Sequence, residues 1–202
     1  MLNRPQRNRI LNTTVLLEGW SRVVRIEYEQ LARDGNIQTI DRDLLNRGDG
    51  VTVLLYNLVR GTVLLLRQPR IIATVSGFDS GETIEACNGL METANPQECA
   101  LREVEEETGH RPTSLVPIGS FYASPGSSLE LVHIFLAEYD HHTRVGEGGG
   151  NAVEGEDIEL IEITVDEAMR WILDGRIRDA RTILAIQYFF LRVWTKQRPH
   201  PS

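Results

Sequence analysis

The chain has 202 residues, 41% hydrophobic and 25% charged, which is typical of a globular protein with one large domain or one domain and a small appendage. Its net charge of −8 argues against nucleic acid or an anionic membrane as the main partner, although a few arginines or a divalent ion can still create a local site for a small anion. The two cysteines have no metal or redox spacing, and no signal-type apolar core follows the N-terminus, so we predict a cytoplasmic protein. The one long apolar stretch is short for a bilayer and is interrupted by Gln187 and Arg192, so we predict no membrane span.

Residues 1–46 are predicted to form a small antiparallel β unit. The segment RVVRIEYEQLARDGNIQTI partly alternates apolar and polar residues, and its Asp34-Gly35 pair is typical of a hairpin turn. Roughly three strands cannot bury a core of their own. We therefore expect this unit to pack on the main domain or on a second subunit, with RGDG marking the break before the main domain, 47–202.

The main domain is predicted to be a mixed α/β sandwich. Strands are expected at 51–58, 62–69, 114–124, 129–139 and 157–163. Two helices are expected to close the chain, the first with Thr164 and Glu167 as a capping box and the second over about 179–194. The polar, glycine-rich segment from His141 to Asp157 is long for a loop inside a domain, which indicates a functional or disordered segment.

The stretch REVEEETGH places four glutamates in five positions of a helix predicted to begin after Asn95 and to end at Gly109. At helical spacing Glu103, Glu106 and Glu107 share one face. On a wet face each like-charge pair costs only about 0.2–0.5 kcal/mol, so a solvated acidic face explains the helix taken alone. In a cleft, two charges about 4 Å apart repel by roughly 4 kcal/mol at an effective dielectric near 20, and the cluster would then need a cation.

The segment GLMETANPQECALREVEEETGH resembles the Nudix box, whose pattern is Gly, five residues, Glu, seven residues, then Arg-Glu-apolar-x-Glu-Glu-x-Gly-apolar. The matching residues are Gly89, Arg102, Glu103, Val104, Glu106, Glu107 and Gly109. The spacer after Gly89 is one residue short, Asn95 replaces the first glutamate, and His110 replaces the last apolar residue. The resemblance implies the Nudix fold, an α/β/α sandwich with a mixed β-sheet, and hydrolysis of a nucleoside diphosphate derivative with Mg²⁺, for which Mn²⁺ can substitute.

Beyond the box, the chain most resembles the GDP-mannose pyrophosphatase branch, through stretches such as RGDGVTVLLYN, ETIEACNGL, YASPGSSLELVH and GRIRDARTIL. That branch also binds the metal through a backbone carbonyl before the box glycine, here Asn88, and a glutamate of the late glycine-rich loop, here Glu156. The resemblance thus implies a metal site of the Asn88 carbonyl, Glu103, Glu107 and Glu156, and a catalytic set of Arg102, Glu103, Glu106, Glu107 and Glu156. An acidic loop residue in water is the alternative for Glu156.

The same resemblance implies substrate contacts from residues along the whole chain: Trp20, Arg42, Arg70, Gly89, Glu130 and Arg181. Trp20 matches an aromatic residue that stacks on the base, and Arg42 an arginine from the partner subunit of a homodimer. Core or interface packing is the alternative for Trp20, and a strand-edge carboxylate for Glu130. Asp41 and Asp43 depart from the branch pattern, which leaves the base and the sugar open.

The implied reaction converts GDP-mannose and water to GMP and mannose 1-phosphate. The alternatives are hydrolysis of ADP-ribose to AMP and ribose 5-phosphate, and a Nudix-fold module that senses a nucleotide sugar without turnover. The retained glutamates of the box argue against a sensor, because such a protein has no need of their mutual repulsion. His133, His141 and His142 are interpreted as solvated residues, since adjacent histidines do not easily face one ion and no cysteine or carboxylate spacing supports them.

Overall fold

The computed structural model describes residues 6–77 and 80–197, which fall into two compact units. Unit 1 contains the described residues up to Asp49 together with Tyr122–Leu131. Unit 2 contains Gly50–Phe121 and the described residues from Val132 onward. Among the described residues, no helix combines the length and the hydrophobicity that a bilayer crossing requires.

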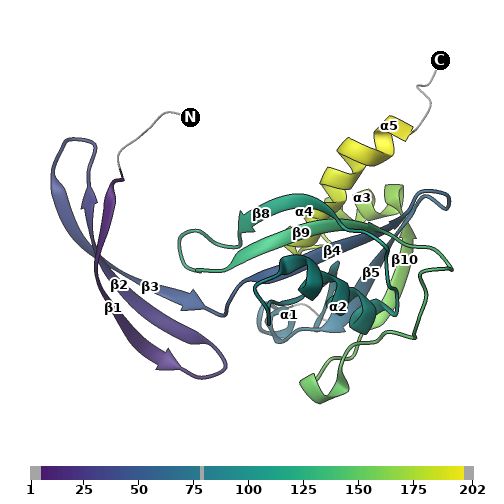
Figure 1. Ribbon diagram of the computed structural model, residues 1–202, viewed down its shortest axis with the longest axis horizontal. Coiled ribbons are helices and arrows are strands. Elements are labelled where there is room, and N and C mark those ends of the chain that lie inside the picture. The colour runs from purple at the N-terminus through teal and green to yellow at the C-terminus, as the bar shows by residue number, and fades with distance from the viewer. Residues whose placement is uncertain (1–5, 78–79, 198–202) are drawn as a thin grey trace. The chain divides into compact units, whose positions relative to one another are not determined.

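Unit 1 is built on a three-stranded antiparallel sheet in the order β1-β2-β3 (Figure 1). The strands are β1 (Asn8–Glu18), β2 (Arg22–Leu31) and β3 (Ile37–Asn46). Asp34 and Gly35 lie in the turn between β2 and β3, as predicted, with Gly35 in the left-handed region at a φ of 89°. Val24 is the one buried residue of these three strands, so the sheet has almost no core of its own.

Two further features of unit 1 follow from this small core. The segment from Tyr122 to Leu131 extends the unit, because the Leu45 N–H donates to the Ser127 carbonyl and the Leu129 N–H donates to the Leu45 carbonyl, both at 2.9 Å. Strand β1 exposes large apolar side chains along most of its length: Ile10, Leu11, Val15, Leu16 and Leu17. An apolar strand of this kind is suited to burial against another surface.

Unit 2 contains a seven-stranded mixed sheet with the path β10-β5-β4-β9-β8, to which β6 adds beside β5 and β7 beside β4. Its strands are β4 (Gly50–Asn57), β5 (Thr62–Pro69), β6 (Glu82–Glu85), β7 (Cys87–Leu90), β8 (Val116–Tyr122), β9 (Leu131–Glu138) and β10 (Glu159–Thr164). Strands β4 and β9 run parallel, whereas β4 pairs with β5 and β7 in the antiparallel direction.

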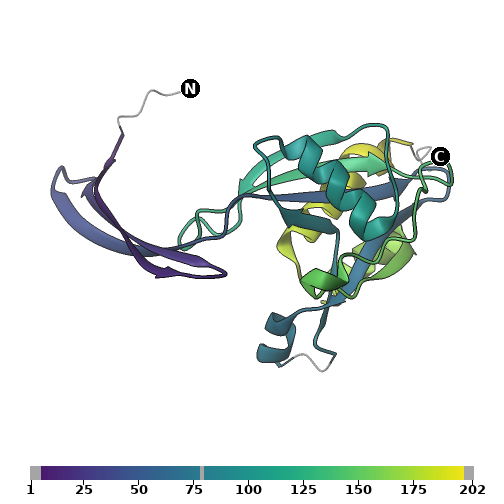
Figure 2. The same cartoon turned by 60° about the horizontal axis from the view of Figure 1, so that its bottom comes forward.

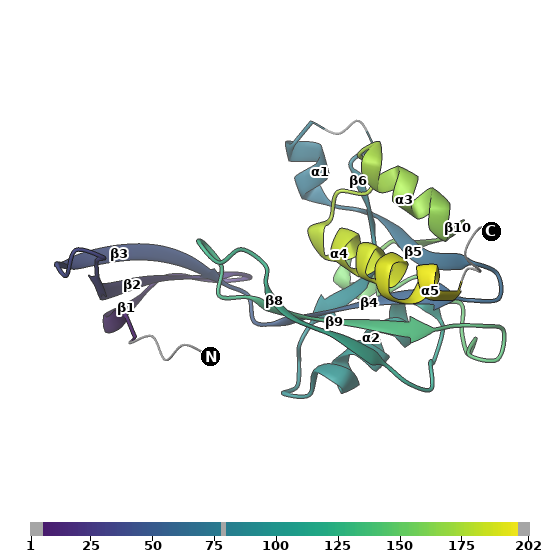
Figure 3. The same cartoon turned by 90° about the horizontal axis from the view of Figure 1, so that it is seen from above.

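Helices cover both faces of this sheet, with α2 (Pro96–Thr108) on one face and α3 (Val165–Leu173) and α4 (Ala180–Phe189) on the other (Figure 3). The remaining helical segments are α1 (Ile71–Val75), the 3-10 helix η1 (Ala152–Glu154), the π-helical turn η2 (Phe190–Trp194) and α5 (Thr195–Gln197). Alternate residues of β4 point into two cores, Leu54 toward α4 and Val53 toward α2. The predicted α/β/α sandwich with a mixed sheet is confirmed.

The helix ends follow the predicted capping residues. The Asn95 side chain accepts a hydrogen bond from the backbone N–H of the second residue of α2, and Gly109 ends the helix in the left-handed region at a φ of 69°. Thr164 caps α3 and Asp179 caps α4 through their side-chain oxygens. The last predicted helix differs in one respect, since α4 ends at Phe189 and the chain continues as a π-helical turn.

Helix α1 was not predicted. It projects from the rest of unit 2 (Figure 2), and three of its five residues, Ile71, Ile72 and Val75, are more than 60% exposed. A single helical turn whose apolar residues face water gives no amphipathic pattern for sequence analysis to detect.

Strands β4 and β5 separate along their length, and the candidate site lies where they do. The two strands pair only over Leu55–Asn57 and Thr62–Leu64, at one end. Beyond that point they separate, and β4 pairs instead with β7 while β5 pairs with β6. The continuous segment 82–90 therefore fills the gap between the two strands, where it runs beside α2.

Candidate active site

Two glutamates of α2 are buried against β7. Glu103 is 8% exposed and Glu107 is 1% exposed, whereas Glu106 is exposed to solvent. The Arg102 guanidinium donates to Glu103 Oε1 at 2.6 Å and to Glu106 Oε2 at 2.8 Å, so one arginine pairs with both glutamates. Part of the acidic cluster is thus inside the protein, which excludes a fully solvated acidic face.

Gly89 lies directly against the Glu103 carboxylate. A Cβ atom at position 89 would stand 2.1 Å from Glu103 Cδ and 2.2 Å from Glu103 Oε1. Glycine is needed here for close approach and not for an unusual φ angle. The predicted site residues Gly89 and Glu103 are therefore adjacent.

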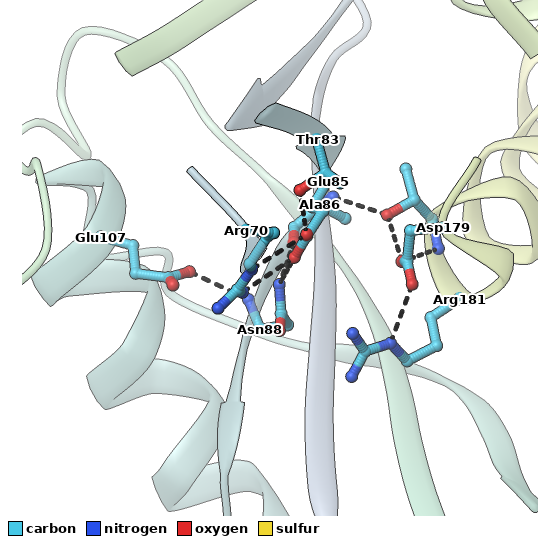
Figure 4. Close-up of polar contacts among 9 residues, drawn as sticks. Arg70, Thr83, Glu85, Ala86, Asn88, Glu107, Asp179 and Arg181 are labelled. Atoms are coloured by element: carbon cyan, nitrogen blue, oxygen red, sulfur yellow. Dashed lines mark hydrogen bonds and ion pairs between the residues drawn. The ribbon is translucent and has the colours of Figure 1, made fainter. Parts of the chain in front are cut away.

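The Glu107 carboxylate is held by the backbone of β7. Its Oε2 accepts a hydrogen bond from the Asn88 N–H at 2.9 Å (Figure 4). Its Oε1 is buried and has no partner at hydrogen-bonding geometry among the described residues, and the buried Cys87 thiol is the side chain that interacts with this carboxylate. Because burying an unpaired carboxylate oxygen is costly, this atom fits a position where a cation or a proton binds.

The buried carboxylates resist ionisation. Burial raises the pKa of Glu103 to about 7, with repulsion from Glu106 and Glu156 adding to the effect and Arg102 opposing it. Burial likewise raises the pKa of Glu107 to about 8; the hydrogen bonds from the Cys87 thiol and the Asn88 N–H oppose this rise, and the charges of Glu103 and Glu156 add to it. A divalent cation would relieve this repulsion, and the all-oxygen donor set is the kind that Mg²⁺ prefers.

Glu156 reaches this cluster through the glycine-rich loop. The Gly149 N–H donates to the Glu107 carbonyl at 2.9 Å, so the loop satisfies a carbonyl that the C-terminal end of α2 leaves without an intrahelical partner. Further on, the Asn151 N–H donates to Glu156 Oε2 at 2.8 Å. The negative charge of Glu156 acts on both Glu103 and Glu107, which places all three carboxylates in one cluster.

Backbone packs on backbone where this loop meets α2. Gly148 has a φ of +73°, and a Cβ there would stand 2.6 Å from the Thr108 carbonyl carbon and 2.7 Å from the Glu107 carbonyl oxygen. Gly109 has a φ of +69°, and its Cβ would stand 2.2 Å from the Gly146 carbonyl oxygen. The predicted functional loop is therefore anchored at its glycine-rich part, and the glycines are needed for contact as well as for conformation.

Arg70 lies at the end of β5 and forms a two-bond ion pair with Glu85. The Arg70 Nε and Nη2 donate to Glu85 Oε1 and Oε2 at 3.1 and 2.9 Å. Burial opposes the charge of Arg70, but the hydrogen-bonded Glu85, together with Glu107 and Glu156, outweighs burial and raises the Arg70 pKa. Glu85 was not predicted from the sequence; the signal for it is the alternation in ETIEA, which places Thr83 and Glu85 on one face of a strand.

Arg181 and its neighbours hold the other side of the same segment. The Arg181 Nε donates to Asp179 Oδ1 at 3.2 Å, and Asp179 Oδ2 accepts from the Thr182 N–H and hydroxyl at 2.9 and 2.7 Å. The Thr182 hydroxyl oxygen accepts from the Ala86 N–H at 2.8 Å. Segment 86–88 is thus bonded to α4 on one side and to Glu107 of α2 on the other, as Figure 4 shows.

Three predicted substrate-contacting residues, Trp20, Arg42 and Glu130, belong to unit 1, and their part in the site stays a prediction. Trp20 is 85% exposed, which excludes core packing, and the Arg47 guanidinium lies 4.0 Å from its ring centroid. The Arg42 Nη1 donates to the Asp41 carbonyl, and Asp43 forms a two-bond pair with a β2 arginine.

His141 and His142 lie in an exposed turn, as solvated residues do. Ligand atoms of Asp140, His141 and His142 lie within 4.8 Å of one another, so a carboxylate does accompany the adjacent histidines. Asp140 Oδ1 accepts the N–H groups of His142 and Thr143, which makes this a closed polar turn, and both histidines are exposed. His133 hydrogen-bonds Ser120 at 2.8 Å.

The mixed sheet between helices is the fold that the resemblance implies, and two residues of the matched box, Gly89 and the buried Glu103, lie side by side in it. The model of the NUDIX domain matches residues 46–185, and the chain belongs to the Nudix family. The prediction of family and fold is confirmed.

Several relatives of similar length show which Nudix proteins this chain is similar to in sequence. The GDP-mannose pyrophosphatase of Pectobacterium atrosepticum is 40% identical over 92% of this chain and 95% of its own length. Those of Cronobacter sakazakii and Escherichia coli are 39% and 37% identical, over 91% and 89% of this chain and 95% and 93% of their own lengths. A crystal structure of an ADP compounds hydrolase superposes with a TM-score of 0.69 and 20% identity, covering 96% of this chain and 97% of its own, which supports the fold. The prediction of a Nudix pyrophosphatase is thereby confirmed.

Proposed function

We propose that this enzyme hydrolyses the diphosphate linkage of a nucleotide sugar with Mg²⁺ as cofactor, and that GDP-mannose is converted to GMP and mannose 1-phosphate. One observation carries the proposal: the buried pair of Glu103 and Glu107, with an unpaired Glu107 oxygen, lies in one electrostatic cluster with Glu156 and Arg70. Carboxylates that need a divalent cation beside an arginine suit a diphosphate. The relatives named as GDP-mannose pyrophosphatases support the choice of substrate.

We assign the metal ligands as the carboxylates of Glu103, Glu107 and Glu156 and the backbone carbonyl of Asn88. The hydrogen bond from the Asn88 N–H occupies one Glu107 oxygen and leaves the other for the ion. When bound, Mg²⁺, or Mn²⁺ in its place, neutralises charge on the diphosphate and lowers the pKa of a coordinated water. Arg102 holds Glu103 in place and balances Glu106, which adds negative charge at the edge of the cluster.

The substrate contacts are proposed as follows. Arg70 and Arg181 neutralise the diphosphate, and Gly89 lets the backbone of β7 approach the site. Trp20 stacks on the base, Glu130 contacts the sugar, and Arg42 acts from the partner subunit of a homodimer. The apolar side chains exposed along β1 support dimerisation through unit 1, since a sheet with one buried residue gains a core by pairing with a second copy.

Product analysis tests the function. Purified protein with Mg²⁺ is given GDP-mannose or ADP-ribose at equal concentration in separate reactions, and the nucleotides released are separated by anion-exchange chromatography. We expect faster release of GMP than of AMP. Faster release of AMP would move the substrate to ADP-ribose, and no turnover of either would favour the sensor. Glu107→Gln is run beside it, so that contaminating activity is recognised.

A further inference from the structure

The guanidinium of Arg70 is held by the Glu85 carboxylate, each oxygen of which accepts two hydrogen bonds. Glu85 Oε1 accepts from the Arg70 Nε and the Thr83 hydroxyl, and Oε2 accepts from the Arg70 Nη2 and the Asn88 side-chain amide. The Glu85 side chain is 6% exposed. Four donors on one buried carboxylate leave it little freedom to rotate, so the orientation of Arg70 is defined by its surroundings.

Arg70 is also close to the carboxylates that we assign to the metal. In Figure 4 its guanidinium lies between Glu85 and Glu107, and the negative charges of Glu107 and Glu156 act on it. Without a second anchor, an arginine in this position would be drawn to the unpaired Glu107 oxygen and would compete with the cation for it. The two hydrogen bonds that Arg70 donates to Glu85 keep the guanidinium away from Glu107. They use Nε and Nη2, so Nη1 takes no part in the pair.

We propose that Glu85 is a positioning residue, which orients Arg70 for the substrate diphosphate and keeps it out of the metal position. This inference rests on the proposed function and deepens it by naming a residue that acts through Arg70. Asn88 connects the two parts of the site, because its N–H binds Glu107 while its side-chain amide binds Glu85. One residue of β7 therefore supports both the metal ligand and the partner of the arginine.

A second ion pair of the same chemistry provides the comparison. Glu105 and Arg111 also form a two-bond pair, at 2.7 and 2.6 Å, but their side chains are 39% and 63% exposed, and helical spacing places Glu105 away from the face of the buried glutamates. An exposed pair contributes little to stability. A buried ion pair such as that of Glu85 and Arg70 contributes little more to stability than apolar packing would. We therefore attribute to it the orientation of Arg70.

The test is a double-mutant cycle with steady-state kinetics and Mg²⁺ calorimetry. We expect Glu85→Gln to raise KM for GDP-mannose about tenfold with kcat changed less than about twofold, and to weaken Mg²⁺ binding in the absence of substrate. In an Arg70→Gln background, the same change is expected to raise KM no further and to leave Mg²⁺ affinity unaltered. Glu105→Gln is the matched control and should change neither quantity.

Either of two results would overturn the role of Glu85: wild-type KM and Mg²⁺ affinity in Glu85→Gln, or an equal further rise in KM when Glu85→Gln is added to Arg70→Gln. If Glu85→Gln does not fold, Thr83→Val removes one donor to the same carboxylate and should raise KM about threefold, with wild-type KM contradicting the role. If the wild type hydrolysed neither nucleotide sugar, the proposed function would fail separately. A tenfold weaker binding of inorganic pyrophosphate to Glu85→Gln, measured by calorimetry with Mg²⁺, would then still support the positioning role, and equal binding would refute it.

Discussion

Gly89 and Glu103 are so close that a methyl group at position 89 would stand 2.1 Å from the Glu103 carboxyl carbon. We expect Gly89→Ala to displace Glu103 or β7, to lower kcat/KM at least about 100-fold, and to cost about 1–3 kcal/mol of stability. Kinetics and urea unfolding measure the two effects. Gly126→Ala is the control, since a Cβ at Gly126 meets nothing within 4 Å. Equal activity of the two variants would contradict the close approach.

Glu107→Gln tests the metal assignment. The amide keeps the shape of the side chain and can still accept the Asn88 N–H, but it removes the charge that the ion requires. We expect Mg²⁺-dependent turnover to be abolished while circular dichroism and the unfolding transition remain those of a folded protein. Glu105→Gln, on the opposite side of the helix, should keep wild-type turnover. Wild-type turnover in Glu107→Gln would refute the assignment.

The raised pKa values of Glu103 and Glu107 predict how the stability of the metal-free protein depends on pH. Their ordinary value is 4.5, and in the folded state they are about 7 and 8, so between these limits the folded protein binds more protons than the unfolded chain. The contribution to stability is therefore present below pH 4.5 and is lost as the pH rises through 7 and 8.

Thermal unfolding in EDTA measures this dependence. We expect Tm to fall as the pH is raised from about 6 to about 8.5, and the slope to become smaller in the double variant Glu103→Gln/Glu107→Gln. Other titrating groups are common to both proteins, which makes the difference between the slopes the informative quantity. Identical slopes would show that the two carboxylates ionise normally.

Addition of Mg²⁺ should reverse the pH trend. The ligands bind the ion in their deprotonated form, so protons are released on binding and affinity increases with pH. We expect the rise in Tm on saturation with Mg²⁺ to be larger at about pH 8.5 than at about pH 6. Scanning calorimetry with and without the ion gives both values, and an equal shift at the two pH values would argue for ligands other than buried glutamates.

The anchored loop is tested by two glycines of similar backbone conformation that differ in what an added Cβ would meet. Gly148 and Gly155 both have positive φ angles, +73° and +79°, but only at Gly148 would a Cβ meet the end of α2, 2.7 Å from the Glu107 carbonyl oxygen. We expect Gly148→Ala to detach the loop and weaken Mg²⁺ binding at least about tenfold, while Gly155→Ala changes it little. Isothermal calorimetry compares them, and equal affinities would show that docking does not position Glu156.

The sequence predicted what local chemistry determines. Asn95 and Gly109 set the ends of α2 because a cap acts on neighbouring backbone groups, and Gly89 and Glu103 were paired through a motif with fixed spacing. These predictions required no knowledge of the tertiary fold.

The residues that were missed act over long separations. Glu85 binds Arg70 across the pairing of β5 and β6, and the Thr182 hydroxyl reaches Ala86 from a helix 96 residues further along the chain. Neither pairing leaves a periodic pattern, because each depends on which strands and helices become neighbours. The exposure of Trp20 could not be predicted for the same reason, because it depends on which residues of unit 1 pack beside the indole ring.

The anchoring of the glycine-rich loop on α2 also bears on how the enzyme is made. In the proposed site the ligands come from β7, from α2 and from a loop that is synthesised much later, and the carbonyl of Glu107 holds that loop by the Gly149 N–H. A nascent chain can form α2 early, by local hydrogen bonding, yet it lacks Glu156 until most of unit 2 has been synthesised. In the proposed site, full coordination of the ion would wait for this late loop, so that a chain ending before Glu156 would lack one of the ligands.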